Sequence, residues 1–368
     1  MPPRGPPRRP PRRPLPSVIS AGYANWGECD GKVELAARTG VNVIIWFAIE
    51  LTVAPGGKPV VSGGPNLTCV ADTAARLEAG GLPTHHFISV GGWDAPHPDP
   101  AVPLEAWWAA LTSWDESAER AGLRGGFDGL DWDLEGNDDR SSPRSRFSAA
   151  GLRLVADLSA RAKASGRFVS LAPPQSYLDA STDEFSLSLA LPARCWHAEF
   201  AYAGRNAYAA LLALAPPDTF DFVSLQLYES WSRAGCMLSR HRLPLGAYLA
   251  LLVGEMRRGW RVGFDREPSL GLRNRSVAVP ADRLLLGLAN GWAGEGGKAL
   301  FLPPAEVGRA WAALPVRPRG LMFWDIADEG RAPAGGGTPL FFAGGLNRFL
   351  HTRPATARFP GETRGVHV

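Results

Sequence analysis

Acidic and large apolar side chains alternate over residues 127–136, FDGLDWDLEG. Successive side chains of an extended strand point to opposite faces, so the acids at 131, 133 and 135 share one face and the apolar residues between them share the other. A helix would scatter both groups. Carboxylates this close repel one another, so some of them must hold protons or accept strong hydrogen bonds. Asp131, Asp133 and Glu135 are therefore candidates for acid–base chemistry. The alternative, a solvated edge strand, would be expected to carry Lys or mixed charges.

Motifs of other chemistries are missing from the sequence. GEGGKAL lacks the first glycine and the final Ser/Thr of a P-loop, and neither HExxH nor GxSxG occurs. The adjacent His85 and His86 open a predicted strand, where a solvated or hydrogen-bonded pair outweighs a metal site. Asp128 has the opposite parity to the three acids, so we expect a structural role for it. We expect no cofactor and no metal.

Length and composition are those of a globular protein. The 368 residues allow one large α/β barrel or two ordinary domains. Hydrophobic residues make up 45% and charged residues 20%, within the globular range. The formal net charge of +3 includes five arginines in the first sixteen residues, MPPRGPPRRPPRRPLP, so the remainder carries −2. A near-neutral body argues against nucleic-acid binding. The sequence contains no run of eighteen apolar residues, so we expect no membrane span.

The two chain ends are expected to lie outside the folded domain. The Arg/Pro-rich residues 1–16 cannot bury a core, and we expect a disordered, partly polyproline-like leader there. This leader lacks the apolar region of a secretory signal. A basic interaction arm, an atypical targeting segment and a mis-started chain all stay open as interpretations of it. We expect one domain over residues 17–350 and a flexible tail over residues 351–368.

The cysteines do not form a metal-binding motif. They are far apart and include no CxxC pair, which argues against zinc: Cys29, Cys69, Cys195 and Cys236. Two disulfides and four buried thiols both stay open. The sequons at 66–68 and 274–276 would be used only in a secretory pathway.

Eight short β-rich apolar runs recur along the chain, at residues 17–26, 41–49, 85–92, 126–136, 167–174, 221–230, 283–292 and 320–326. Stretches with helical spacing lie between them, such as 69–81, 104–122, 147–166 and 305–314. Alternating β and α segments predict parallel strands with right-handed crossovers, and eight such units close a TIM barrel. A doubly wound sheet is the alternative, but its usual GxGxxG is missing. We predict a single-domain α/β fold, a TIM (β/α)8 barrel.

The predicted barrel puts the acids where barrel enzymes have their active sites, at the C-terminal ends of the strands. Glu135 ends the fourth predicted strand, and the polar loop GNDDRSS follows it. Between the seventh and eighth strands, the residues from Trp292 to Gly320 hold one crossover helix and no extra domain.

These motifs resemble glycoside hydrolase family 18, the chitinases and their relatives. DGLDWDLE at 128–135 resembles the family's DxxDxDxE signature, and SVGG at 89–92 resembles its SxGG motif on the third strand. QLY at 226–228, GLMFW at 320–324 and GYANW at 22–26 also fit the sixth, eighth and first strands. The resemblance spans almost the whole predicted barrel. Ordered motifs on the proper strands are more specific than one motif alone.

Three features depart from the common family pattern. Many members carry Met where Gln226 stands, and Asp or Asn where Glu229 follows the tyrosine; the glutamine resembles the plant-type branch. No insertion separates the seventh and eighth strands, which suggests a short form with an open groove. These departures bear on substrate length and cleavage mode and leave the chemistry in place.

The resemblance implies retaining, substrate-assisted hydrolysis. Family 18 uses the substrate's own 2-acetamido oxygen as the nucleophile. Glu135 would act as acid and then as base, Asp133 would accept the acetamido N–H, and Asp131 would share a proton with Asp133. Tyr228 would hold the acetamido oxygen near the anomeric carbon. Negative neighbours would keep Glu135 protonated near neutral pH. A purely structural role for Asp131 stays open.

Aromatic residues at strand ends are expected to bind the sugar. Pyranose rings present C–H faces that pack on aromatic rings, so Trp324, Tyr23, Phe47 and Trp93 are candidates for the floor of the subsite. Trp324 matches the family's floor tryptophan. Gln226 completes the expected substrate-binding set.

The resemblance implies an endo-acting chitinase, a hydrolase that cleaves β-1,4 bonds of N-acetylglucosamine polymers. An endo-β-N-acetylglucosaminidase acting on N-glycans and a non-catalytic chitin-binding lectin are the alternatives. Inactive members typically lose the terminal glutamate, which Glu135 retains here. The expected partner of this predicted monomer is chitin or N-acetylglucosamine oligosaccharide, with no nucleic acid and no membrane span. The family implies an extracellular or secretory location.

Overall fold

Eight parallel strands close into a barrel in the computed structural model, which describes residues 12–25, 31–136, 146–188, 204–229, 232–295, 299–332 and 338–352. The barrel strands are β1 (Ile19–Asn25), β2 (Val43–Val53), β4 (His85–Gly92), β5 (Gly129–Leu134), β6 (Phe168–Leu171), β7 (Phe222–Gln226), β10 (Leu284–Ala289) and β11 (Gly320–Trp324). Each pairs with its neighbours along the chain, and β1 pairs with both β2 and β11 to close the ring. The predicted single-domain TIM barrel and all eight of its strands are confirmed.

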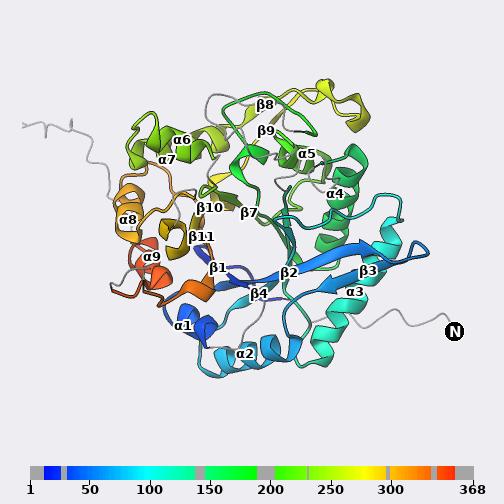
Figure 1. The fold of residues 1–368 in the computed structure, drawn as a ribbon, viewed down its shortest axis with the longest axis horizontal. Coiled ribbons are helices and arrows are strands. Elements are labelled where there is room, and N and C mark those ends of the chain that lie inside the picture. The colour runs from blue at the N-terminus through cyan, green and yellow to red at the C-terminus, as the bar shows by residue number, and fades with distance from the viewer. Residues whose placement is uncertain are drawn as a thin grey trace, which may run out of the picture.

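The helices form an outer ring around the strands (Figure 1). They are α1 (Lys32–Arg38), α2 (Leu67–Ala79), α3 (Leu104–Arg120), α4 (Ala149–Ala164), α5 (Ala207–Leu214), α6 (Arg233–Ser239), α7 (Leu245–Arg258), α8 (Pro304–Ala312) and α9 (Phe342–Leu350). The four stretches with helical spacing correspond to α2, α3, α4 and α8. The predicted crossover between the last two barrel strands is α8. Among the described helices, none combines the length and apolar character that crossing a bilayer requires.

Smaller elements decorate the barrel. Strand β3 (Pro59–Gly63) pairs antiparallel with the end of β2, and the resulting hairpin projects beyond the barrel (Figure 1). A second hairpin joins β8 (Trp260–Val262) to β9 (Arg275–Val277). The short 3-10 helices are η2 (Gln175–Tyr177), η3 (Phe264–Arg266), η4 (Pro268–Leu270), η5 (Ala281–Arg283), η6 (Gly291–Glu295) and η7 (Ile326–Asp328).

Alternation along the strands divides the hydrophobic core in two. On β1, Ile19, Ala21 and Tyr23 belong to a cluster inside the barrel, together with Phe87 and Met322 from other strands. The residues of opposite parity pack outward against the helices in a much larger cluster. This division follows from the two faces of an extended strand.

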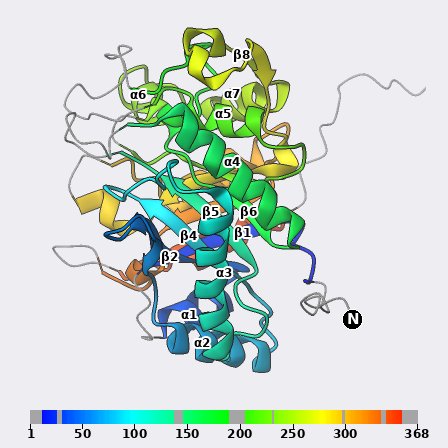
Figure 2. The ribbon, with the colours of Figure 1, turned by 90° about the vertical axis from the view of Figure 1, so that its right-hand side faces the viewer.

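The last residues of the predicted leader lie against the base of the barrel, and this differs from the expected disorder over 1–16. Arg12 donates to Asp128 at 3.0 Å, and Arg319 donates to the carbonyl of Pro16 at 2.9 Å. Leu15 packs against the interior cluster. Figure 2 shows this dark-blue start of the chain on the side away from the arrowheads of the strands. Residues 1–11 lie outside the described residues. A charged arm can dock because the base offers acceptors and a carboxylate.

Asp128 and the two histidines belong to this base. Asp128 also accepts from the backbone N–H of His86 at 2.9 Å, which gives it the structural role predicted from its parity. His85 and His86 are hydrogen-bonded, and both are buried. The indole N–H of Trp46 donates to Nδ1 of His86 at 3.1 Å, so that nitrogen carries no proton. Burial lowers the pKa of His86 to about 4, which keeps the ring neutral.

The cysteines that lie in described segments are oxidised. Cys69 of α2 and Cys236 of α6 each take part in a disulfide bond. Cys29 and Cys195 lie outside the described residues. The sequence left disulfides and buried thiols open, and at these two positions the structure has disulfides.

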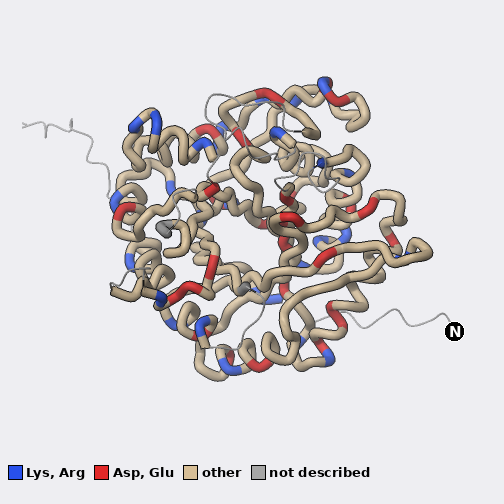
Figure 3. The backbone as a smooth tube through the Cα atoms, viewed as in Figure 1, with Lys and Arg blue, Asp and Glu red and all other residues tan. Residues whose placement is uncertain are grey.

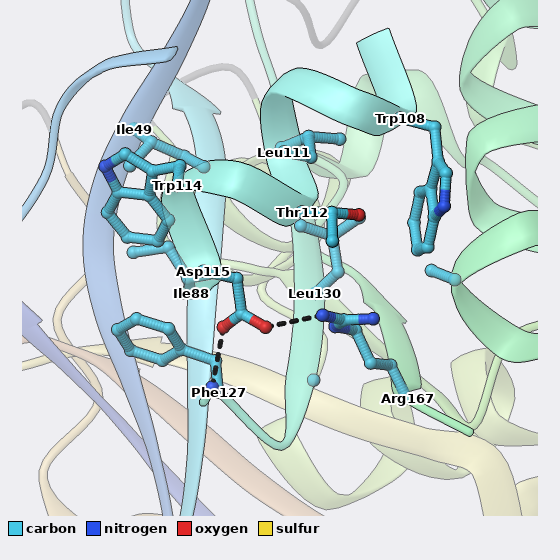
Figure 4. A pocket seen from close by; sticks show the side chains of 12 residues that line it. Ile49, Ile88, Trp108, Leu111, Thr112, Trp114, Asp115, Phe127, Leu130 and Arg167 are labelled. Atoms are coloured by element: carbon cyan, nitrogen blue, oxygen red, sulfur yellow. Dashed lines mark hydrogen bonds and ion pairs between the residues drawn. The ribbon is translucent and has the colours of Figure 1, made fainter. Parts of the chain in front are cut away.

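A small cavity lies between the barrel strands and the outer helices, beside a buried ion pair. It holds about 30 Å³ between α3, β4 and β5, which is far too little for a sugar. Figure 4 shows Asp115 at its edge, bonded to the backbone N–H of Phe127 and to the guanidinium of Arg167. Arg167 in turn lies over the ring of Trp108, 5.4 Å from its centroid. The buried ion pair ties α3 to the start of β6.

Candidate active site

The three acids of β5 and its end lie at the mouth of the barrel. Figure 3, viewed into the ring, shows acidic positions around its central opening. Asp131 and Asp133 alternate with outward-facing Trp132 along the strand, and Glu135 follows its last residue. All three acids are buried, and Glu135 retains 5% of its surface exposed. The strand parity that predicted one shared face is confirmed.

Asp131 is held by three hydroxyl groups from three other strands. Its Oδ2 accepts from Tyr23 at 2.7 Å and from Ser89 at 2.9 Å, and its Oδ1 accepts from Ser170 at 2.6 Å. Burial raises the pKa of Asp131, and the three bonds oppose that rise. The deepest acid is thus fully hydrogen-bonded. Ser170 was not predicted as a site residue, although its inward parity on β6 was a usable signal.

Asp133 and Glu135 are joined through one amide. Nε2 of Gln226 donates to Oδ1 of Asp133 at 2.8 Å and to Oε1 of Glu135 at 3.2 Å. It also contacts the carbonyl of Ala172 at 2.8 Å. The structure therefore brings the predicted Gln226 from β7, two strands from β5, against both carboxyls.

Burial favours the protonated forms of both Asp133 and Glu135, and neighbouring negative charges add to this effect at Asp133. Burial raises the pKa of Glu135 to about 7, and its bonds with Gln226 and Asp133 oppose the rise. Burial, followed by the charges of Glu135 and Asp131, raises the pKa of Asp133 well above its usual value. A carboxyl that titrates near neutral pH can give up a proton and take one back. Glu135 therefore has the electrostatic setting of a general acid.

Tyr228 lies at the end of β7 beside the acids. Burial and the nearby charges of Glu229, Asp133 and Glu135 raise its pKa well above the usual value, so its hydroxyl keeps its proton. Burial and then the charge of Glu135 also raise the pKa of Glu229 well above its usual value. The sequence marked Glu229 only as a departure from the family pattern. The structure makes it a further acid near the mouth.

Three of the predicted aromatic residues form one cluster. The ring centroid of Trp324 lies 4.6 Å from that of Phe47 and 5.5 Å from that of Tyr23. The peptide bonds after Phe47 and Trp324 are both cis. Trp292, which was not predicted, donates its indole N–H to the carbonyl of Trp324 at 2.8 Å and meets Tyr228 edge-on. Trp324 is partly exposed in this cluster, as a sugar platform must be.

Trp93 differs from the other predicted aromatic residues. It follows β4 and is 43% exposed, so it lies on the rim instead of in the packed floor. Tyr23 is the opposite case, because its ring is buried and its hydroxyl is bound to Asp131. Both stay predictions as substrate contacts.

The glycines of SVGG are required by close packing at the mouth. Gly91 and Gly92 both have left-handed φ angles, of 106° and 101°. A Cβ on Gly91 would lie 2.5 Å from the carbonyl oxygen of Asp133, and one on Gly92 would lie 2.2 Å from the ring of Phe47. Only glycine lets β4 approach the acids and the aromatic floor this closely.

The fold places this chain among TIM barrels with acids at the C-terminal mouth, and solved structures share that fold. A GH18 chitinase from Pseudoalteromonas aurantia is 15% identical with a TM-score of 0.52, covering 84% of this chain and 95% of its own. The C-terminal domain of ChiA from Legionella pneumophila is 13% identical with a TM-score of 0.52, covering 84% and 93%. Concanavalin B is 14% identical with a TM-score of 0.52, covering 90% and 99%. No protein-family model and no curated protein sequence matches the chain. At these identities the likeness concerns the fold.

Proposed function

We propose that this chain is a glycoside hydrolase that cleaves β-1,4 bonds of N-acetylglucosamine polymers such as chitin. The observation that carries the proposal is the pair of Glu135 and Asp133, bridged by Gln226 at the barrel mouth. The acid of such a reaction must be protonated near neutral pH, and the pKa of Glu135, about 7, meets that need. The fold shared with family 18 chitinases supports the same reaction class.

The proposed reaction uses the substrate's acetamide as nucleophile. Glu135 gives its proton to the glycosidic oxygen while the acetamido carbonyl oxygen bonds to the anomeric carbon and the glycosidic bond breaks. Asp133, with its proton passed to Asp131, accepts the acetamido N–H and balances the positive charge of the resulting oxazolinium. Water then adds to the anomeric carbon as the bond from that carbon to the acetamido oxygen breaks and restores the acetamide, and the Glu135 carboxylate takes a proton of that water. Two displacements at one carbon retain the β configuration.

The other predicted residues have supporting roles in this mechanism. Tyr228, whose hydroxyl keeps its proton, would donate to the acetamido oxygen and hold it near the anomeric carbon. Asp131, bound by three hydroxyls, would stabilise Asp133 from behind. Trp324 would carry the sugar's C–H face.

The test compares substrates on the purified protein and its Glu135→Gln variant. Early products of N-acetylglucosamine oligomers, a matched cellulose series and a high-mannose glycopeptide are followed by proton NMR. We expect β products from the N-acetylglucosamine oligomers, inert cellulose oligomers, and loss of several orders of magnitude in rate for Glu135→Gln with binding retained.

Each other outcome has a defined meaning. Inverted α products, or cellulose cleaved at a comparable rate, would refute substrate assistance. Cleavage of the glycopeptide alone would identify the N-glycan endoglycosidase. Binding of the oligomers without any cleavage by the wild type would identify the lectin.

A further inference from the structure

The pairing of β5 with its neighbouring strands ends before Glu135. On the β6 side the last paired residue of β5 is Trp132, and on the β4 side it is Leu134. The carbonyl of Glu135 and the N–H of Gly136 therefore have no strand to pair with. Both residues are buried, and buried backbone groups need hydrogen-bond partners.

Three aromatic side chains from separate segments bind this stretch of backbone: His97 and Tyr177 supply those two partners, and Tyr208 binds Leu134 just before them. The hydroxyl of Tyr208 on α5 accepts from the N–H of Leu134 at 2.6 Å. The hydroxyl of Tyr177 on η2 accepts from the N–H of Gly136 at 3.1 Å. Nε2 of His97, in the loop after β4, lies 2.8 Å from the carbonyl oxygen of Glu135. A carbonyl only accepts, so this nitrogen of His97 carries a proton and donates it.

These side chains meet around Phe147. Its ring centroid lies 4.6 Å from His97 and 5.3 Å from Tyr177, and the rings of Tyr177 and Tyr208 stack 6.3 Å apart. A cavity of about 520 Å³ borders His97, Phe147 and the outward side chain of Leu134. Leu134, Phe147 and the two tyrosines are nevertheless buried in the core cluster, so the packing and the hydrogen bonds together hold the end of β5.

We propose that His97, Tyr177 and Tyr208 are positioning residues that hold the backbone of Glu135 so that its carboxyl stays in reach of Gln226 and the substrate. For its kinetic consequence this inference rests on the proposed function. The bond from Gln226 to Glu135 is 3.2 Å long, near the upper limit for N–H···O, so a small backbone shift breaks it. A misplacement of about 1 Å costs a catalytic group about 100-fold in rate.

The test replaces His97 in two ways. His97→Leu removes the donor, whereas His97→Gln keeps an N–H that reaches the carbonyl. We expect kcat to fall about 10- to 100-fold in His97→Leu with KM little changed, and to recover to within a few-fold of the wild type in His97→Gln. Tyr177→Phe removes a single hydroxyl and serves as a milder variant if His97→Leu fails to fold.

His86→Leu is the matched control. His86 is also a buried histidine with two ring hydrogen bonds, but it lies at the opposite end of the neighbouring strand β4. Its replacement should lower stability and leave kcat unchanged. Equal losses of kcat in His86→Leu and His97→Leu would overturn the inference, because they would reflect a general loss of stability.

A second measurement separates this inference from the proposed function. Carbon-13 NMR of glutamate-labelled protein, with Glu135→Gln as the assignment standard, follows the carboxyl of Glu135 without any substrate. The bond from Gln226 lowers the pKa of Glu135, so His97→Leu or Tyr177→Phe should shift this titration to higher pH. If the wild type hydrolyses no sugar but the variants show this shift, the result would refute the hydrolase and keep the positioning role. Unchanged titrations in folded variants would overturn the positioning role.

Discussion

Replacing Gln226 by Met should move the pH at which activity is lost. Gln226→Met removes an amide donor that stabilises the ionised form of Glu135, so the pKa of Glu135 rises in the variant. The acid must be protonated to work, and activity falls as pH rises through its pKa. The alkaline limb of the pH profile, at about pH 7 in the wild type, therefore moves to higher pH in the variant.

The size of this shift follows from how Gln226 divides its two N–H groups. Three acceptors share them, and the bond to Glu135, at 3.2 Å, is longer than the 2.8 Å bonds to Asp133 and Ala172. A hydrogen bond to a charged group contributes about 1.5 to 3 kcal/mol, and the longest of three contributes near the lower end. Since about 1.4 kcal/mol corresponds to one pH unit, we expect an upward shift of about one unit.

The assay is kcat/KM from pH 5 to 9 on a fluorogenic N-acetylglucosamine oligomer, because this ratio reports the pKa values of the free enzyme. The pH at which kcat/KM falls is measured independently of the maximal kcat/KM. Weaker substrate binding by Gln226→Met lowers the maximum and does not obscure the shift in pH. A limb that stays in place, or that moves to lower pH, would show that Gln226 does not tune the acid.

Two further changes test other parts of the structure. Trp324→Ala should weaken oligosaccharide binding by about 1 to 3 kcal/mol, measured by calorimetry, because a stacked sugar face loses its platform; an unchanged Kd would make Trp324 a core residue only. A chain that starts at residue 17 should be about 2 to 4 kcal/mol less stable to urea than one that starts at residue 12, because it loses the bonds of Arg12 and Pro16 and leaves Asp128 and Arg319 without them. Equal unfolding midpoints would show that the docked arm contributes nothing.

The sequence by itself determined the barrel and the identity of the acids. Both depend on local periodicity: an alternation of two marks a strand whatever surrounds it, and it assigns Asp131, Asp133 and Glu135 to one face. The apolar runs and the helical spacing between them are equally local, so β4 was predicted with its observed bounds. The same reasoning gave Asp128 the opposite face and a structural role.

Only the tertiary structure decided what surrounds those acids. Ser170 and Tyr23 lie on different strands, yet both bind Asp131, and Gln226 reaches Glu135 from a strand two places away in the barrel. The docking of Arg12 on Asp128 joins segments 116 residues apart, which is why composition alone predicted a disordered leader. Periodicity within a segment carries no information about which distant side chain will meet it. Barrel closure brings these groups together, and burial there sets the pKa values on which the proposed chemistry depends.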